Sequence, residues 1–356
     1  MTEWSAVPSA QVQEFDMALA TPESYNAMLD AAKAGGYAFP AINITSSSTI
    51  TAAIQGFAEA ESDGIIQVSV GGGQYASGAA MVKDQVVGSL ALAAYAREVA
   101  DSYGVTIALH TDHCHATYVD SWLRPLLAAS TEKVKAGGLP IFQSHMWDGS
   151  SVPMDENLAL AAELLELSAA ANTILEIEIG VVGGEEDGHA AEINEKLYTT
   201  AEDGLKTVEA LGTGEKGRYL TALTFGNVHG AYKPGAVKLR PEILGDIQAE
   251  VGAKVGKDMP FDLVFHGGSG STAEEIAIAV SHGVIKMNVD TDTQYAYTRP
   301  VVDHMLKNYD GVLKVDGEWG NKKAYDPRAW GKLAEAGMAA RVVEACQQLG
   351  SSGRKI

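Results

Sequence analysis

Eight short runs of β-branched and other apolar residues recur along the chain, and most are separated by stretches of helical character. The intervening segments, such as "TITAAIQGFAEAE" and "ENLALAAELLELSAAA", are rich in Ala, Leu and Glu, which favours helix. Strands that alternate with helices form parallel sheets through right-handed crossovers, so the pattern predicts an α/β fold. The expected strands are residues 38–43, 64–69, 105–110, 140–145, 173–180, 219–225, 262–266 and 283–289.

Eight such units over roughly 250 residues have the size of a TIM (β/α)8 barrel, and a doubly wound open sheet is the alternative. With 356 residues, 46% of them hydrophobic, the chain can bury one large core. We expect a single barrel domain over residues 1–356, with strands within about 38–289 and a short N-terminal segment. A C-terminal helical extension is expected over about 292–350, including a helix over 325–347 that begins near Pro327.

Composition excludes several classes of function. The formal net charge of −20 argues against nucleic acid and anionic membranes as partners. No apolar run approaches the length of a membrane span, and the N-terminus lacks the pattern of a secretory signal. The two cysteines, Cys114 and Cys346, offer no disulfide framework and suit a reducing compartment, so we expect a cytoplasmic protein.

Polar residues gather at or just after the C-terminal ends of the predicted strands, and every strand contributes. In a parallel barrel these ends form one rim, which is where catalytic groups lie, so the pattern indicates an enzyme. The residues are Asn43, Ser69, His110, Asp112, His113, His145, Asp148, Glu176, Glu178, His229, His266, Asn288 and Asp290.

His113, His229 and His266 each follow a different strand. Three imidazoles that converge from three strands can bind one Zn²⁺ and leave its fourth position open, as catalytic zinc requires. The alternative is that each is a hydrogen-bonded histidine of the rim.

Two carboxylates in one strand point the same way, since Glu176 and Glu178 are two residues apart. Inside a barrel they need a cation or hydrogen bonds. Glu178, nearer the rim, could reach a metal, whereas Glu176 is expected to have a structural ion partner. Asp148 is either a further oxygen ligand or a cap or turn acceptor, and Cys114 is expected to be a small buried residue.

Two glycine-rich segments follow strands of the second half. "HGGSGST" (266–272) opens a helix, and with "NVDTDT" (288–293) it predicts a phosphate site after the last two strands. "VVGGEEDGH" (181–189) is either a solvated acidic loop or a lid that carries a carboxylate base. His115, His189, His282 and His304 fall in expected loops or helices and receive no role.

Five segments together resemble the class II, metal-dependent fructose-bisphosphate aldolases: "HTDHC", "EIEIGVVGGEEDG", "FGNVHGAYKPG", "VFHGGSGS" and "IKMNVDTDTQ". The resemblance runs from about Thr21 to Gln347 and is closest to the longer subtype with the HTDHC motif, which "GNKKAYDPRAW" also resembles. It implies a TIM barrel, usually a homodimer. The implied reaction is reversible cleavage of fructose 1,6-bisphosphate to dihydroxyacetone phosphate and glyceraldehyde 3-phosphate through a zinc-stabilised enediolate, in glycolysis or gluconeogenesis.

The resemblance also implies roles for individual residues. His113, His229 and His266 would bind the catalytic Zn²⁺, and Asp148 and Glu178 a second or alternative metal position shared with His113; a monovalent cation near the phosphate is implied too. Asp112 would act on the C4 hydroxyl, Glu186 would exchange the proton at the dihydroxyacetone phosphate carbon, and Asn288 would hold the enediolate. The implied ketose-phosphate pocket comprises Gly230, Gly267, Gly268, Ser269, Asp290 and Thr291. The implied contacts to the aldehyde-side substrate are Asn43, Ser69 and Arg328, the last reaching from the partner subunit.

The segment after HTDHC, "HATYVDSW", departs from the family pattern by placing His115 where Lys, Gln or Pro is expected. Three alternatives to the metal aldolase remain. A Schiff-base aldolase would use Lys286, which otherwise is an ion partner for a core carboxylate such as Glu176. A zinc hydrolase would activate water, but the phosphate loops and the absence of a His-x-His pair on the first strand count against it. A non-catalytic barrel would not need the set of acids and histidines at the rim.

Overall fold

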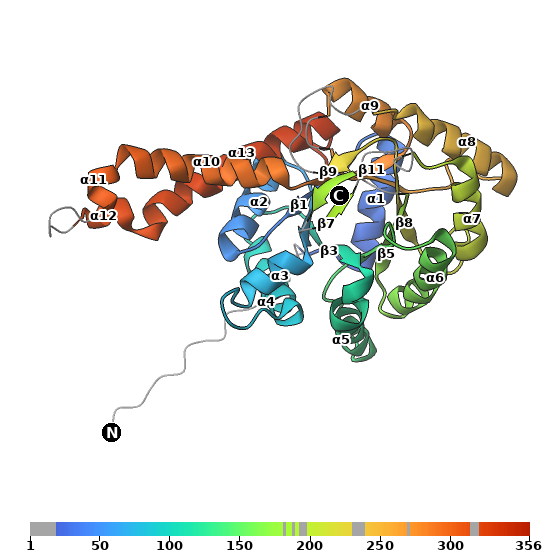
Figure 1. Cartoon of the computed structure of the whole chain (residues 1–356), viewed down its shortest axis with the longest axis horizontal. Coiled ribbons are helices and arrows are strands. Elements are labelled where there is room, and N and C mark those ends of the chain that lie inside the picture. Colours follow the sequence, from blue (N-terminus) through green and yellow to red (C-terminus); the bar gives the residue numbers. More distant parts are fainter. Residues whose placement is uncertain are drawn as a thin grey trace.

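The computed structural model describes residues 19–180, 183–186, 189–191, 198–229, 239–268, 271–313 and 320–356, and it describes side chains for all of these except 183–186, 189–191 and 229. Its centre is a closed barrel of eight parallel strands in the order β1-β11-β10-β8-β5-β4-β3-β2, so each barrel strand pairs with its neighbours in the chain (Figure 1). The predicted TIM barrel is therefore confirmed. The barrel strands are β1 (Phe39–Asn43), β2 (Gly64–Val68), β3 (Ile107–His115), β4 (Ser144–Asp148), β5 (Ile174–Ile179), β8 (Tyr219–Leu223), β10 (Leu263–Phe265) and β11 (Val284–Val289).

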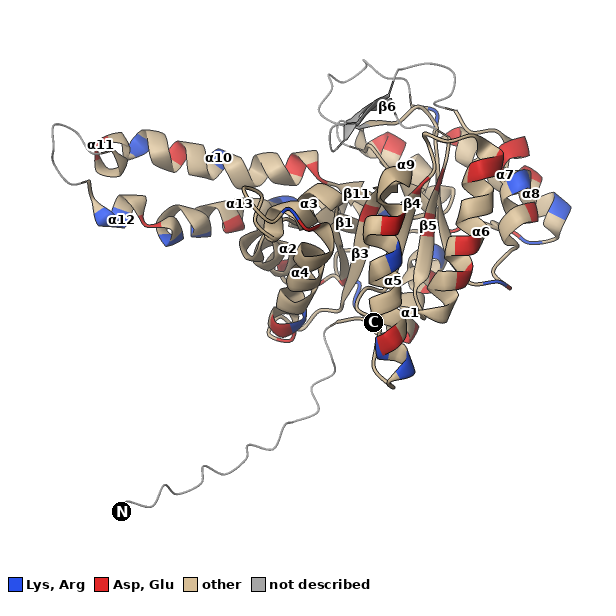
Figure 2. Ribbon diagram, turned by 60° about the horizontal axis from the view of Figure 1, so that its bottom comes forward, with Lys and Arg blue, Asp and Glu red and all other residues tan. Residues whose placement is uncertain are grey.

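Helices surround the barrel, and a long helical arm extends from it (Figure 1). The arm comprises three helices and much of a fourth, the final helix, which matches the predicted helix over 325–347 to within two residues at each end. Figure 2 shows the arm beside the barrel, with acidic residues spread over the outer helices. The helices before the arm are α1 (Pro22–Gly35), α2 (Ser47–Glu59), α3 (Val70–Ala76), α4 (Gln85–Ala100), α5 (Arg124–Lys135), α6 (Met154–Ala170), α7 (Ala201–Leu211), α8 (Glu242–Val255) and α9 (Ala273–Ser281). The arm helices are α10 (Thr291–Lys307), α11 (Tyr309–Val312), α12 (Lys322–Tyr325) and α13 (Pro327–Leu349). No helix among the described residues is long and apolar enough to span a membrane.

The fourth strand was predicted too early in the chain. The prediction placed it at 140–145, whereas β4 is Ser144–Asp148. Before the strand begins, Gln143 is already bonded to β3: its backbone N–H donates to the Leu109 carbonyl at 2.9 Å, and its side-chain oxygen accepts from the Leu109 N–H at 2.7 Å. The apolar residues of "PIF" thus precede the strand, whose sequence is "SHMWD".

α1 closes the N-terminal end of the barrel. Thr21 caps this helix, and Tyr25, Met28 and Leu29 pack in one buried cluster with inward-facing strand residues such as Ile65. Ion pairs fasten the helix at its edge: Lys33 Nζ lies 2.8 Å from Asp262 Oδ1, and Arg218 Nη2 lies 2.8 Å from both Asp30 and Asp262. All three N–H groups of Lys33 are used, because it also donates to the carbonyls of residues 259 and 261.

The middle of the barrel is polar. Glu176 and Lys286 are both fully buried, and Lys286 Nζ lies 3.0 Å from Glu176 Oε2 and 3.2 Å from Oε1. Burial by itself would raise the pKa of Glu176, but the charge of Lys286 and the nearby His110 and His266 lower that pKa well below its usual range. The structural ion partner expected for Glu176 is therefore Lys286.

A second, small sheet lies outside the barrel. β6 (Gly183–Glu186) pairs antiparallel with β7 (His189–Ala191) and parallel with β9 (Val228–His229). The segment 181–189, for which a loop or lid was predicted, therefore contains a strand whose backbone is tied to the segment that follows β8.

Replacing Lys286 by Met should destabilise the protein strongly, because it leaves the Glu176 carboxylate in the barrel without its cation. We expect the free energy of unfolding to fall by about 3–5 kcal/mol in K286M, measured by urea denaturation. The double variant E176Q/K286M should recover part of the loss, because it removes both charges. K206M is a matched control: Lys206 forms an exposed ion pair with Glu202, so its loss should leave the denaturation midpoint close to that of wild type. Equal midpoints for K286M and K206M would contradict this account.

Candidate metal and acid–base site

A bulge at the end of β3 directs His113 into the barrel mouth. β3 continues five residues beyond the predicted end at residue 110, and its pairing with β4 shifts register between Thr111 and Cys114. His113 itself has φ of 38°, a left-handed backbone conformation that a non-glycine residue adopts at some cost. The bulge thus changes the direction of one side chain at the rim, which is a frequent use of bulges next to functional sites.

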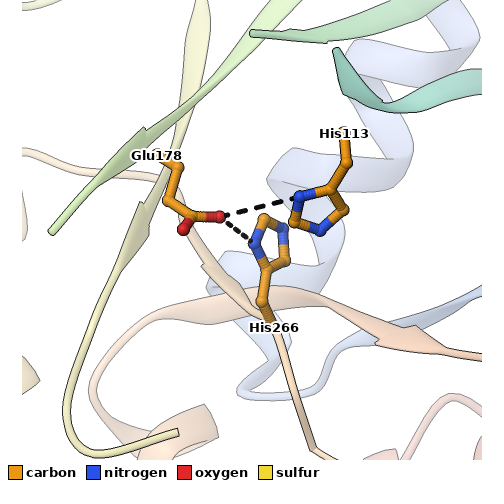
Figure 3. Close-up of side chains that lie close together, drawn as sticks. All are labelled: His113, Glu178 and His266. Atoms are coloured by element: carbon orange, nitrogen blue, oxygen red, sulfur yellow. Dashed lines mark hydrogen bonds and ion pairs between the residues drawn. The ribbon is translucent and has the colours of Figure 1, made fainter. Parts of the chain in front are cut away.

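His113, Glu178 and His266 meet at the centre of this rim (Figure 3). One ligand atom from each lies within 4.8 Å of the others, and all three residues are buried. Glu178 Oε2 is 2.9 Å from His266 Nδ1 and 3.9 Å from His113 Nδ1. Two imidazoles and a carboxylate from β3, β5 and the end of β10 are a donor set that suits Zn²⁺ and related divalent metals.

His266 is held from both sides by carboxylates. Its Nδ1 faces Glu178, while its Nε2 lies 2.9 Å from Glu176 Oε1. Burial would lower the pKa of His266, but its hydrogen bonds to Glu176 and Glu178 outweigh burial and raise that pKa. A histidine that binds a metal through one nitrogen commonly has a carboxylate on the other, and Glu176 stands in that position.

Asp148 lies beside the triad and accepts hydrogen bonds from two imidazoles. Its Oδ2 is 3.1 Å from His113 Nδ1 and 3.0 Å from His115 Nδ1, and Ser150 donates its backbone N–H to Oδ1 at 3.0 Å. Burial would raise the pKa of Asp148, but the hydrogen bonds from His113 and His115 hold it well below its usual range. Asp148 therefore belongs to the same cluster of side chains as the triad and also accepts the Ser150 N–H as a turn acceptor. It is not a helix cap, because Pro153 is the N-cap residue of α6.

His115 belongs to this cluster and was passed over in the sequence. It was expected in a loop, yet it is the last residue of β3. The signal was its spacing, because residues two apart on a strand face the same way, and His113 was already a candidate. Cys114, between them, is fully buried as expected, and burial raises the pKa of its thiol, which keeps it protonated.

Asp112 is surrounded by amide donors. Asn43 Nδ2 and Gln67 Nε2 each lie 2.9 Å from Asp112 Oδ2, and Asn288 Nδ2 lies 3.0 Å from Oδ1. Amide N–H groups only donate, so these contacts favour an ionised carboxylate although Asp112 is only 1% exposed.

The direction of the Asn288 amide is fixed by Lys286. Lys286 Nζ, which can only donate, lies 2.6 Å from the Asn288 side-chain oxygen, which leaves the Asn288 NH₂ for Asp112. Gln67 was missed in the sequence, where the signal was an amide side chain within the apolar run "GIIQVS". It is fully buried.

The structure describes part of the predicted phosphate pocket. Gly267 has φ of 62°, and a Cβ there would lie 2.7 Å from the Val228 carbonyl carbon, so only glycine fits so close to the neighbouring chain. Asp290 is the N-cap residue of α10 and Thr291 its first residue, which places a long helix's N-terminus at the rim. Gly268 and Asn288 line a common small cavity.

Of the other predicted residues, two are described and four concern parts outside the described residues. Ser69 is the N-cap of α3 and accepts from the Gly72 N–H at 3.2 Å. Arg328, in the first turn of α13, has a side chain 89% exposed and paired with Asp326 at 2.7 Å, so it does not join the site of its own chain. Gly230 and Ser269, and the side chains of Glu186 and His229, for which roles were predicted, lie outside the described part of the chain.

Comparisons with known proteins agree over nearly the whole chain. Residues 23–354 match the family model described as Fructose-bisphosphate aldolase class-II. A fructose-bisphosphate aldolase of Streptomyces coelicolor is 64% identical over 343 residues, covering 96% of this chain and 100% of that protein. One of Mycobacterium tuberculosis is 62% identical, covering 96% of this chain and 99% of that protein.

A solved structure is similar as well. The crystal structure of the fructose-bisphosphate aldolase from Campylobacter jejuni superposes with a TM-score of 0.84 at 38% identity, covering 95% of this chain and 97% of that one. The match covers almost every residue of this chain and the whole of a relative that is 64% identical, which shows membership of a family rather than a shared barrel alone. The chain belongs to the class II, metal-dependent fructose-bisphosphate aldolase family.

Proposed function

We propose that the protein catalyses the reversible aldol cleavage of fructose 1,6-bisphosphate into dihydroxyacetone phosphate and glyceraldehyde 3-phosphate. The observation that carries the proposal is the placement of the His113–Glu178–His266 triad directly beside a second, amide-bound carboxylate, Asp112. Aldol cleavage needs an electrophile for the carbonyl and a separate base for a hydroxyl. A metal held by the triad would supply the first, and Asp112, whose Oδ1 lies 3.9 Å from His113 Nε2, would supply the second.

His113, His229 and His266 are proposed to hold a catalytic Zn²⁺, with Asp148 and Glu178 forming a second or alternative position and a monovalent cation near the phosphate. The described donors fit, because they are buried imidazoles and carboxylates on or directly after four strands, with Glu176 behind His266. When bound, the metal would supply Lewis-acid stabilisation of the negative charge that develops on the substrate carbonyl oxygen.

Asp112 is proposed to take the proton of the C4 hydroxyl as the C3–C4 bond breaks, and to return it in the condensation direction. The amides of Asn43, Gln67 and Asn288 support this role, because they keep the carboxylate ionised and fix its orientation. Glu186 is proposed to exchange the proton at the dihydroxyacetone phosphate carbon. Each of these proton transfers is of a kind that contributes about 10²–10⁴-fold to rate.

Asn288, whose amide Lys286 orients, is proposed to hold the enediolate through its NH₂ group. Gly230, Gly267, Gly268, Ser269, Asp290 and Thr291 are proposed to bind the ketose-side phosphate at the N-terminus of α10. Asn43 and Ser69 are proposed to contact the aldehyde-side substrate. Lys286 is a poor candidate for a Schiff base, because its ammonium group is engaged by Glu176 and Asn288.

Arg328 is proposed to serve the aldehyde-side phosphate of a second copy of the chain, in a homodimer. Two features of the arm support this. Arg328 lies in the first turn of α13, directly after α12 in the chain, and its side chain is exposed; both helices belong to the arm that extends from the barrel (Figure 1). The arm also exposes large apolar side chains that a partner would cover: Tyr295, Val302, Leu306, Tyr309, Leu313, Tyr325 and Leu333.

Cleavage of fructose 1,6-bisphosphate should be lost on dialysis against EDTA and restored by Zn²⁺. Incubation with substrate and borohydride should leave activity unchanged, because no lysine adduct forms. The assay couples triose phosphate formation to NADH oxidation. Activity that survives EDTA and is destroyed by borohydride would overturn the metal mechanism and point to Lys286.

Mixing two inactive variants should restore activity if Arg328 works across a dimer. R328A and D112N chains are each expected to be inactive, but a mixed dimer pairs an intact Asp112 site with an intact Arg328 from the partner. After unfolding and refolding together at equal amounts, about a quarter of wild-type activity should return. Variants that stay inactive when mixed, although light scattering shows mixed dimers, would assign Arg328 to its own chain.

A further inference from the structure

The phosphate pocket proposed at the start of α10 contains an acidic side chain that a phosphate would repel. Asp292 lies in the first turn of α10, directly after Thr291, and its side chain is 38% exposed. Arg341 of α13 holds its carboxylate, with Nη2 2.8 Å from Asp292 Oδ2. We infer that Arg341 is a positioning residue for the substrate: it neutralises Asp292 and so lets this helix end accept the ketose-side phosphate. The inference rests on the proposed function, because it concerns the phosphate pocket proposed there.

A small cavity brings this ion pair close to the groups proposed to contact the substrate. The cavity has a volume of about 90 Å³, and its lining includes Asp292, Arg341, Gly268 and Asn288. Gly268 is proposed to bind the phosphate, and Asn288 is proposed to hold the enediolate. Arg341 can reach this cavity because α13 packs alongside α10 (Figure 1).

The charges at the start of α10 oppose one another. The free N–H groups of a helix N-terminus attract a phosphate, but a carboxylate in the same turn repels it and competes for the same partial positive charge. The repulsion is substantial, because a phosphate carries about two negative charges near pH 7. A guanidinium that is only 18% exposed and bonded to Asp292 cancels this repulsion where water screens poorly.

The position of Arg341 directs its charge toward Asp292. Its other acidic neighbour is Glu344, one turn along α13, whose Oε2 lies 3.9 Å from Arg341 Nε and whose side chain is 63% exposed, so water screens that contact. Arg341 Nη1 is buried and bonds to no described residue, and the same is true of Ser271 Oγ, which lines the same cavity. The guanidinium therefore keeps donor capacity for the cavity after it has bound Asp292.

A neutralising role and a purely structural role for this ion pair predict different results. If the pair only braces α10 against α13, removal of either member should weaken phosphate binding alike. If Arg341 neutralises Asp292, removal of the arginine leaves a negative charge facing the phosphate, whereas removal of the aspartate leaves a positive one. The two single substitutions should then act in opposite directions.

The condensation direction separates the two phosphates of the substrate. Dihydroxyacetone phosphate carries only the ketose-side phosphate and glyceraldehyde 3-phosphate only the other, so each KM reports on one phosphate. R341M should raise the KM for dihydroxyacetone phosphate roughly tenfold, the order expected for one nearby charge in a partly buried site. The KM for glyceraldehyde 3-phosphate and kcat should stay close to those of wild type, because binding that is lost equally in the ground and transition states appears in KM alone.

Three further variants identify the charge as the cause. D292N should leave the KM for dihydroxyacetone phosphate unchanged or lower it, and R341M/D292N should return it to near the wild-type value. R341K keeps the positive charge and should retain most of the affinity, although lysine lacks the planar fork of arginine.

Two controls remove exposed charges. E344Q removes the other acidic neighbour of Arg341, and K206M removes a cation from an exposed ion pair with Glu202 on α7. Both variants should keep the two KM values of wild type, because water screens these charges.

Several outcomes would overturn the inference. Equal increases in the KM for dihydroxyacetone phosphate in R341M and D292N would show a brace, and an unchanged KM in R341M would show no role. An increase in R341M that is the same for both triose phosphates would show a general disturbance of the mouth. If R341M does not fold, D292N decides, because a raised KM there contradicts neutralisation. Wild-type protein that does not cleave fructose 1,6-bisphosphate would instead overturn the proposed function.

Discussion

The Glu176 carboxylate at the centre of the barrel holds the site together. It faces Lys286 from β11, His266 from the end of β10 and His110 from β3, so one side chain links strands on opposite sides of the barrel. Two of these partners, His266 and Lys286, orient groups that lie nearer the mouth. His266 presents its Nδ1 to Glu178, and Lys286 turns the Asn288 amide toward Asp112. The candidate metal triad and Asp112 are thus two ends of one hydrogen-bonded network whose middle is an ion pair.

The three carboxylates above this pair differ in what surrounds them. Asp148 receives imidazole donors, Asp112 receives amides, and Glu178 faces two histidines of the triad. Amide donors hold a carboxylate charged without offering it a proton, which suits a group that must accept one from a substrate. Imidazole donors can give their protons up and become ligands, which suits a group beside a metal. The chemistry of each acid follows from its neighbours more than from its own type.

Much of this could be predicted from the sequence, because alternating strands and helices place every strand's C-terminal end on one rim. That rule found Asp112, His113, Asp148, Glu178, His266 and Asn288, and the structure brings them together. It failed where contacts are not periodic. Gln67 looked like one polar residue in an apolar strand, and β4 was displaced because the Gln143 side chain substitutes for a strand bond. The bulge at His113 arises from pairing between strands, which one strand's pattern does not reveal.

The helix α1, which closes the end of the barrel away from the mouth, restricts how molecules enter and leave the site. Since α1 packs into that end and is held by ion pairs at its edge, the described residues close the barrel there, and the mouth is left as the way to the triad. In the cleavage direction two products share that single exit.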